Sequence, residues 1–194
     1  MAAVDSLLLP TSQRAIVTQD DGTLAIKDNV SLPQLLQPDM IIIKTVAVAL
    51  NPTDFKVPAR FPSAGTVNGC DFAGRIVQLG PGVTRPLKIG DRVFGAVHGA
   101  NPLCPQSGAF AEYIATYADF VMLIPEDMAW ETAAAIGGAG IGAVGLALFC
   151  SMQLSARPHQ PSEKQFYVLV SGGASASGTM AIQILRRYVR LSKE

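Results

Sequence analysis

The segment Phe166-Tyr-Val-Leu-Val-Ser-Gly-Gly-Ala-Ser-Ala-Ser-Gly178 begins with apolar, strand-forming residues and ends in a Gly/Ser/Ala turn. Its first six residues predict a short buried strand over 166–171, and a helix is predicted to begin near Thr179. Glycines let a strand turn sharply into a helix and let a phosphate approach the backbone N–H groups at the helix N-terminus. The segment is therefore typical of the start of a dinucleotide-binding domain. Its glycine spacing departs from G-x-G-x-x-G, so an ordinary strand–helix turn is an equal alternative.

The residues that precede this segment are rich in strand signals separated by Gly, Pro and Asp turns. An apolar run that then alternates around Lys44 and Thr45 predicts a strand with one face against a core, and the Asp-Asp-Gly turn at 20–22 predicts a hairpin. Strands at this spacing, with little helix, indicate a compact β-barrel. Further along, a helix in two pieces broken at glycines is predicted over Met128–Cys150, followed by a polar link over Ser155–Gln165. The predicted strands are Arg14–Val17, Thr23–Lys27, Met40–Leu50, Asp71–Leu79, Arg92–Val97 and Ala109–Thr116.

The composition excludes several classes of function. The 194 residues are 49% apolar and 15% charged with a formal net charge of zero, so the chain is globular and lacks the basic surface that nucleic acid or an anionic membrane requires. The 3 cysteines are widely spaced and there are only 2 histidines, too few clustered ligands for a zinc cage, and reduced thiols in a cytoplasmic protein are expected. Thr132–Cys150 carries no charge, but its many Ala and Gly residues indicate close packing rather than a membrane span.

A polar cluster, Asn51-Pro-Thr-Asp-Phe-Lys56, ends the longest predicted strand. Thr53, Asp54 and Lys56 could line a cleft, and Lys56 is the cation there that could polarise a carbonyl or pair with a phosphate. The alternative is structural: Asn-Pro opens a turn, Thr53 or Asp54 caps a short helix, and Lys56 is solvated.

No nucleophilic centre is predicted. Cys70 stands beside Asp71, and because negative charge raises a thiol pKa, a buried structural thiol is expected there. His98 and His159 lie in or near turn-rich loops, and the sequence contains no nucleophile elbow.

In their order along the chain, these segments resemble the medium-chain dehydrogenase/reductase superfamily. The zinc-dependent alcohol dehydrogenases of that superfamily carry a Cys after the first long strand and a Gly-His-Glu downstream, where this chain has Thr53-Asp54 and Gly69-Cys70-Asp71. The resemblance therefore implies a member without zinc, in which hydrogen bonds and positioning activate the substrate. It is carried by Asn51–Asp54, Gly69–Gly74, the Gly80-Pro81-Gly82 turn, Ile89–Gly95, Gly108–Tyr113, Ile124-Pro125, the Ala133–Ala147 helix and Val168–Gly173.

Within that superfamily the chain is similar to the fungal trans-acting enoyl reductases that serve polyketide synthases such as the lovastatin assembly line. The shared motifs are Asn-Pro-x-Asp-x-Lys, Gly-Asp-Arg-Val-Phe-Gly-Ala, Pro-Gln-Ser-Gly-Ala-Phe and the helix end Gly-Leu-Ala-Leu-Phe. This resemblance implies NADPH-dependent transfer of a hydride to the β-carbon of an enoyl thioester, with a proton added to the α-carbon. The thioester would be bound to the acyl carrier of a polyketide synthase or PKS-NRPS.

The resemblance also implies roles for individual residues. Thr53 and Lys56 would act in catalysis, and together with Asp54 they would contact NADPH. The phosphates of NADPH would be held by Ser175, Ala176, Ser177 and Gly178. The acyl channel would be lined by Gly140, Ile141, Gly142, Ala143, Val144, Gly145, Leu146 and Ala147.

The expected fold is mixed α/β. A GroES-like β-barrel catalytic domain is expected over 1–130, a connecting helix and linker over 131–165, and the incomplete start of an NADPH-binding Rossmann domain over 166–194. Family members run to roughly twice this length, so the chain is expected to be truncated. The alternatives are a quinone or enone oxidoreductase of the same superfamily and an inactive remnant or non-catalytic binding module. The oligomeric state is left open, a monomer included.

Overall fold

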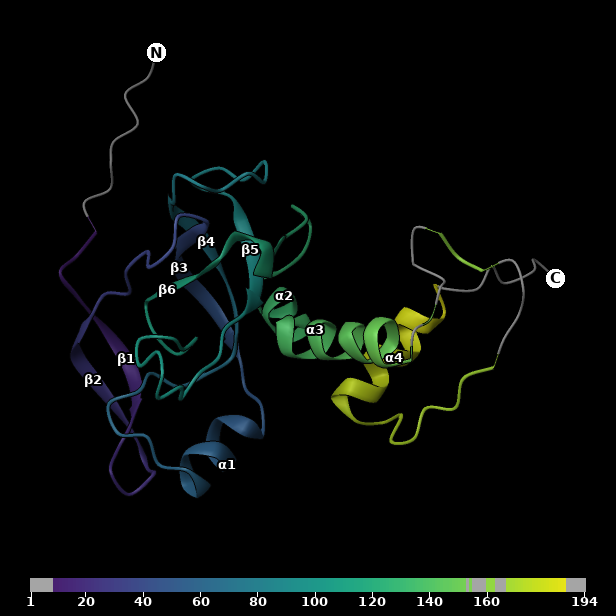
Figure 1. The fold of residues 1–194 in the computed structure, drawn as a ribbon, viewed down its shortest axis with the longest axis horizontal. Helices are drawn as coiled ribbons and strands as arrows, with labels where there is room; N and C mark the ends of the chain where they lie inside the picture. Colours follow the sequence, from purple (N-terminus) through teal and green to yellow (C-terminus); the bar gives the residue numbers. More distant parts are fainter. Residues whose placement is uncertain (1–8, 153, 155–159, 163–166, 188–194) are drawn as a thin grey trace, which may run out of the picture. The chain divides into compact units, whose positions relative to one another are not determined.

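The computed structural model describes residues 9–152, 154, 160–162 and 167–187, apart from the side chains of residues 139–141 and 149. The chain divides into two compact units, Met1–Gly138 and Ala139–Glu194. Figure 1 shows strands throughout the first unit and helices in the second, so the mixed α/β class is confirmed.

The first unit is built around an antiparallel five-stranded sheet with the order β6-β3-β4-β5-β7. The central strand β3 pairs with β4 along most of its length, and its first half also pairs with β6. That first half is the Met-Ile-Ile-Ile run, which is buried, whereas the second half alternates between exposed and half-buried residues. The strands of the sheet are β3 (Met40–Ala49), β4 (Asp71–Leu79), β5 (Arg92–Ala96), β6 (Tyr113–Tyr117) and β7 (Val121–Leu123), with a 3-10 turn, η1 (Ala118–Phe120), between the last two.

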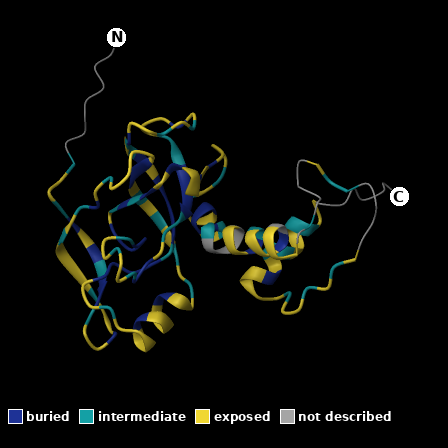
Figure 2. Cartoon of the chain, in the orientation of Figure 1, coloured by how far each residue is buried: buried dark blue, intermediate teal, exposed yellow. Residues whose placement is uncertain are grey.

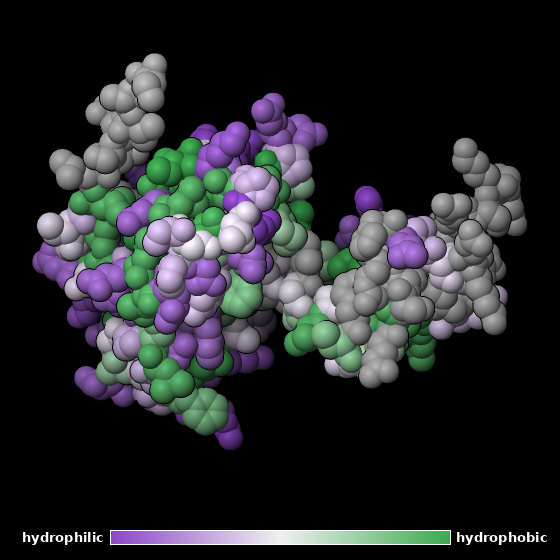
Figure 3. Space-filling model, turned by 45° about the horizontal axis from the view of Figure 1, so that its top comes forward, coloured by the Kyte–Doolittle hydropathy of each residue, from purple (hydrophilic) through white to green (hydrophobic). Residues whose placement is uncertain are grey.

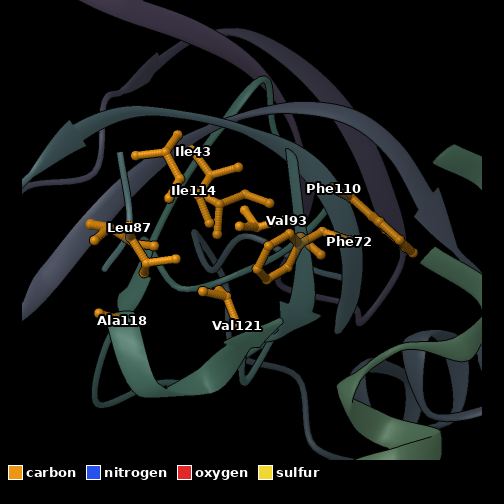
Figure 4. Packing of buried hydrophobic residues seen from close by; sticks show 11 residues of the cluster. Ile43, Phe72, Leu87, Val93, Phe110, Ile114, Ala118 and Val121 are labelled. Carbon is orange, nitrogen blue, oxygen red and sulfur yellow. The ribbon is translucent and has the colours of Figure 1, made fainter. Parts of the chain in front are cut away.

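A contiguous apolar core lies against this sheet. Phe72 on β4 is its largest fully buried side chain, and residues from the neighbouring strands converge on it (Figure 4). Arg85 bridges the backbone of two core residues: its guanidinium donates to the Val121 carbonyl at 2.7 Å and to the Ala118 carbonyl. The buried cluster consists of Ile41, Ile43, Phe72, Ile76, Leu87, Val93, Ala109, Phe110, Ile114, Ala118 and Val121.

A separate antiparallel hairpin is formed by β1 (Ser12–Thr18) and β2 (Leu24–Ser31), as the Asp-Asp-Gly turn predicts. Isolated bridges from β1 to Val67 and Ala111 attach the hairpin to the rest of the unit. The β-barrel prediction is thus confirmed in its strands, with ends that agree with the sequence pattern or differ from it by a few residues.

Helix α1 (Thr53–Arg60) follows β3 directly. It buries only Asp54 and Pro58, and the remainder of the helix is exposed (Figure 2). The short helix foreseen in the structural alternative for this cluster is therefore present.

Helix α2 (Trp130–Ile136) begins where Arg92 holds the preceding loop. The Arg92 guanidinium lies 4.3 Å from the centre of the Trp130 ring and donates to the carbonyls of Glu126 and Met128 at 2.9 and 2.6 Å. Gly137 ends the helix with a φ of +24°, in the region that favours glycine, and α3 (Gly138–Leu146) starts at the next residue. The predicted break at the glycines is confirmed.

The second unit holds most of α3, a π-helical turn, η2 (Ala147–Ser151), and α4 (Ala176–Leu185). The strand predicted over 166–171 is wrong for its described part: residues 167–170 are not in a strand, and Tyr167 and Leu169 are 99% and 96% exposed. A strand needs the hydrogen bonds of a neighbour, and none of the described strands pairs with this segment. Most of the predicted link over 155–165 lies outside the described residues.

The surface of the first unit mixes polar and apolar side chains (Figure 3). None of the helices described by the structure is both long enough and apolar enough to cross a bilayer.

Candidate active site

The polar residues at the end of β3 form a connected hydrogen-bond network. The backbone N–H of Asn51 donates to Oδ2 of Asp54 at 2.7 Å, which closes the turn that leads into α1. The side chain of Asn51 reaches in the other direction, and its Nδ2 donates to Oδ2 of Asp71 at 3.0 Å. Asp54 and Asp71 are 6% and 3% exposed, so this network is inside the domain. Strand β4, where Asp71 stands, is therefore tied to the first turn of α1.

Asn68 completes the support of α1. This residue is 1% exposed, and its Nδ2 donates to the backbone carbonyl of Asp54 at 2.5 Å. In a regular helix that carbonyl would accept from the N–H of residue 58, but residue 58 is a proline and has none. Asn68 supplies the donor that Pro58 lacks.

Burial and charge act together on Asp54 and Cys70. Burial raises the pKa of the Asp54 carboxyl, hydrogen bonds from Asn51 and Cys70 oppose the shift, and the charge of Asp71 adds to it. Burial also raises the pKa of the Cys70 thiol, and Asp54 and Asp71 raise it further against hydrogen bonds from the Gly99 backbone and Thr53. The raised thiol pKa agrees with the predicted structural role of Cys70.

The two predicted catalytic residues stand at the surface of α1. Thr53 is its first residue, and Lys56 lies in its first turns with Nζ 5.9 Å from the centre of the exposed Phe55 ring. Both side chains are exposed, so both are accessible to a ligand. Asp54 is different because its carboxyl points into the domain, and the geometry gives it a structural role. Its predicted contact with a cofactor stays a prediction.

The predicted phosphate-binding residues form the first turn of α4. Ser175 is the N-cap: its hydroxyl accepts from the Gly178 N–H at 3.1 Å and donates to the Gly172 carbonyl at 2.7 Å. Ala176 and Ser177 are exposed at the start of the helix, where the first N–H groups have no intrahelical acceptor. Gly178 is buried, and a Cβ there would overlap the Gly172 carbonyl. The turn is thus closed around Ser175 and leaves N–H groups at its surface.

The predicted acyl-channel residues lie on α3 and the first residue of η2. Gly142, Ala143, Leu146 and Ala147 are exposed, Gly145 is half-buried and Val144 is buried, while the exposures of Gly140 and Ile141 are outside what the structure describes. These residues belong to the second unit, whereas Thr53 and Lys56 belong to the first.

An apolar cavity of about 360 Å³ lies elsewhere in the first unit, between the β1–β2 hairpin and β3. Its walls are mainly Ile16, Ile26, Val48, Leu50 and Phe110, and no predicted site residue contributes to them. The side chains of the network at the start of α1 therefore do not line this cavity.

Two members of the network are not signalled as functional residues by the sequence. Asn68 and the side-chain role of Asn51 depend on contacts with residues distant along the chain, and no local motif indicates them. Among the described residues there is no group of three or more His, Cys, Asp or Glu side chains placed to hold a metal ion. Hydrogen bonds hold this part of the site together.

The sequence of the chain is similar to those of known proteins. Residues 37–126 match the alcohol dehydrogenase GroES-like domain. The trans-enoyl reductase ccsC of Aspergillus clavatus is 49% identical over 189 residues, which are 96% of this chain and 52% of that protein. The trans-enoyl reductase pyiC of Pyricularia grisea is 47% identical over 178 residues, covering 92% of this chain and 48% of that protein. The chain therefore spans about half the length of the curated relatives it matches.

The fold is similar to that of solved structures of related proteins. An alcohol dehydrogenase superfamily protein from Novosphingobium aromaticivorans superposes with a TM-score of 0.72 at 26% identity, over 92% of this chain and 52% of that one. The family match confirms the expected GroES-like domain over residues 37–126, and in sequence and fold the chain is similar to members of the alcohol dehydrogenase superfamily.

Proposed function

We propose that this chain is part of a trans-acting enoyl reductase, which transfers a hydride from NADPH to an enoyl thioester during polyketide synthesis. The observation that carries the proposal is the extent of the similarity to trans-enoyl reductases. At 49% identity it covers 96% of the chain, and so it spans both the loop at the end of β3 and the turn before α4.

The residues before α4 fit a nicotinamide nucleotide. The N-terminal turn of a helix offers N–H groups and a positive dipole end to a phosphate, and Ala176 and Ser177 are exposed there. Ser175 holds the turn in shape through its bonds to Gly172 and Gly178. When bound, NADPH supplies the hydride. The preference for NADPH over NADH rests on the resemblance to enoyl reductases, because the structure describes no residue that reads the 2′-phosphate.

Thr53 and Lys56 are the groups of this chain suited to stabilise the enolate that develops on the thioester. Both are exposed on a helix whose first turn is fixed by Asn51, Asp54 and Asn68, so their backbone positions are set before a ligand arrives. A hydroxyl and an ammonium carried on this fixed backbone would act on developing negative charge without a metal ion.

The substrate would be an acyl chain delivered by a partner. The glycines and alanines among residues 142–147 would leave room beside α3 for an extended acyl group, and the thioester would be presented by the acyl carrier of a polyketide synthase or PKS-NRPS. The work of the chain would then be to bind NADPH and orient the carrier-bound enoyl group.

The test is NADPH binding followed by turnover, both with the 194-residue chain. NADPH is titrated while its fluorescence is recorded, and its oxidation is then followed with a crotonyl thioester and, separately, with a quinone. Thioester reduction that Lys56→Met lowers and the exposed control Lys27→Met leaves unchanged supports the proposal. Quinone reduction alone would identify a quinone oxidoreductase instead. Absence of NADPH binding would instead favour an inactive remnant or a non-catalytic binding module.

A further inference from the structure

The carboxyl group of Asp71 is shared by two segments far apart in the sequence. On one side Oδ2 of Asp71 accepts from Nδ2 of Asn51 at 3.0 Å. On the other side lies Gly137, the residue that ends α2: a Cβ at Gly137 would stand 2.5 Å from Cγ of Asp71 and 2.7 and 2.8 Å from its two oxygens. Asp71 itself is 3% exposed and is the first residue of β4. The carboxyl therefore fills the space between the end of β3 and the α2–α3 junction.

The contact with Asn51 extends to the proposed catalytic residues. The same Asn51 that donates its side-chain amide to Asp71 donates its backbone N–H to Asp54 at 2.7 Å. Asp54 is the second residue of α1, directly after Thr53 and two residues before Lys56. Asp71, Asn51 and Asp54 thus form a continuous path from β4 to the first turn of α1.

The contact with Gly137 explains why this position carries no side chain. Its φ of +24° already favours glycine, and the carboxyl oxygens of Asp71 leave no room for a methyl group. Gly137 and Gly138 are the last residues of the first unit, so Asp71 is packed against the point where the chain leaves that unit.

We propose that Asp71 is a positioning residue that holds both the Asn51–Lys56 loop and the α2–α3 junction in place. Its importance for turnover rests on the proposed function, because it acts through a loop that carries Thr53 and Lys56. Its role in holding the two segments does not depend on the proposed function, so this role and the effect on turnover can be tested separately.

The first test is a double-mutant cycle between Asp71→Ala and Gly137→Ala, read as thermal midpoints from the fluorescence of Trp130. Each single change is expected to lower the midpoint by about 4–10 °C, since one removes a buried hydrogen-bond partner and the other adds a methyl group against the carboxyl. Together they are expected to lower it by clearly less than the sum, because the added methyl group no longer meets a carboxyl. Additive effects would overturn the proposed packing of Asp71 against the junction.

A matched control separates this contact from backbone strain. Gly90 has a φ of +92°, and no atom lies within 4 Å of the position that an added methyl group would take, so Gly90→Ala strains the backbone without meeting a neighbour. Its effect is expected to add to that of Asp71→Ala. If Asp71→Ala does not fold, Asp71→Ser replaces it in both cycles.

The second test observes the Asn51 side chain directly. In the wild-type chain its amide protons are expected to be shifted and slow to exchange in a ¹⁵N spectrum, since they donate to a buried carboxyl. Asp71→Asn keeps an acceptor and is expected to retain a distinct signal, whereas Asp71→Ala should move it to the position of a solvated amide. Because the charge of Asp71 raises the pKa of the Cys70 thiol, Asp71→Asn should also speed alkylation of Cys70 at a fixed pH. An unchanged Asn51 signal in Asp71→Ala would overturn the proposal.

The third test is turnover with a crotonyl thioester. Asp71→Ala is expected to lower kcat by about 10- to 100-fold with a smaller change in KM, because displaced groups lose alignment with the reacting atoms. If the wild-type chain does not reduce the thioester, the proposed function fails, and the cycle and the Asn51 spectrum still decide whether Asp71 positions the two segments.

Discussion

Pro58 stands inside helix α1, and the carbonyl of Asp54, four residues earlier, receives its hydrogen bond from Asn68 instead of from the helix. The change that tests this arrangement is Asn68→Ala. Asn68 is 1% exposed, so water cannot easily replace its amide, and the Asp54 carbonyl would be left without a partner. The first turn of α1, with Thr53 and Lys56, would lose one of its supports.

The expected loss follows from the burial of the pair. Removing one partner of a buried hydrogen bond costs about 1–3 kcal/mol. A domain of this kind has a total stability of about 5–15 kcal/mol, so the effect is large enough to measure. With a urea m-value of about 2 kcal/mol per M, the unfolding midpoint should fall by about 0.5–1.5 M.

A second substitution should make the loss smaller. In Pro58→Ala the new residue has a backbone N–H that can donate to the Asp54 carbonyl within the helix. Asn68→Ala should therefore cost clearly less in the Pro58→Ala background than in the wild type. Asn101→Ala is the matched control: the Oδ1 of Asn101 accepts from the Leu103 N–H at 3.0 Å in an exposed loop, and the loss of this bond should cost no more than about 0.5 kcal/mol.

Unfolding in urea is followed by the fluorescence of Trp130, the single tryptophan of the chain, which lies in the first unit against Arg92. A cost of Asn68→Ala that is the same in both backgrounds, within about 0.5 kcal/mol, would refute the idea that Asn68 substitutes for the donor missing from Pro58.

Three further predictions concern single residues. The pKa of Asp54 is raised above its unfolded value of about 3.9, so its contribution to stability is present below that pH and is lost as the pH rises through the raised pKa. The free energy of unfolding in urea, measured in steps between pH 4 and 7, should fall with rising pH in the wild type and not in Asp54→Asn. If the free energies of the two proteins change in parallel with pH, the prediction is contradicted. Because burial raises the pKa of the Cys70 thiol, Cys70 should react with iodoacetamide at pH 8 more slowly than exposed Cys150, as mass spectrometry of the labelled peptides can show. Gly74→Ala should lower the free energy of unfolding in urea by about 1–3 kcal/mol, because a Cβ on β4 would overlap the Lys44 carbonyl of β3. A change below about 0.5 kcal/mol would show that β3 and β4 can separate enough to admit the methyl group, against this prediction.

The strands of the first unit can be predicted because their signals are local. The Met-Ile-Ile-Ile run and the alternation after it lie in one stretch, and the structure forms β3 over Met40–Ala49 where the pattern predicts Met40–Leu50. Strand β4 over Asp71–Leu79 agrees with its prediction at both ends, because glycine and proline turns delimit it. Periodicity and turn residues are sufficient for these elements.

The support of the candidate site cannot be predicted in the same way. Asn68 reaches Asp54 from another segment, and Asp71 meets Gly137 from a position far away along the chain. None of these residues stands in a local sequence motif that indicates its contact. Only the folded structure shows that its side chain supports another segment. Thr53 and Lys56 are indicated by a motif, and their catalytic roles stay predictions.

The segment 167–170 shows the limit of an apolar pattern most clearly. Its residues have the composition of a buried strand, yet Tyr167 and Leu169 are almost fully exposed. An apolar pattern states which side chains favour burial, but a strand forms only where another strand supplies hydrogen bonds and another layer supplies cover. Ser175, a few residues after this segment, needs no such neighbour, because it caps α4 with bonds to Gly172 and Gly178 only. A local cap forms whether or not the sheet beside it does, and that is why the turn over Gly172–Gly178 is present although the predicted strand before it is not.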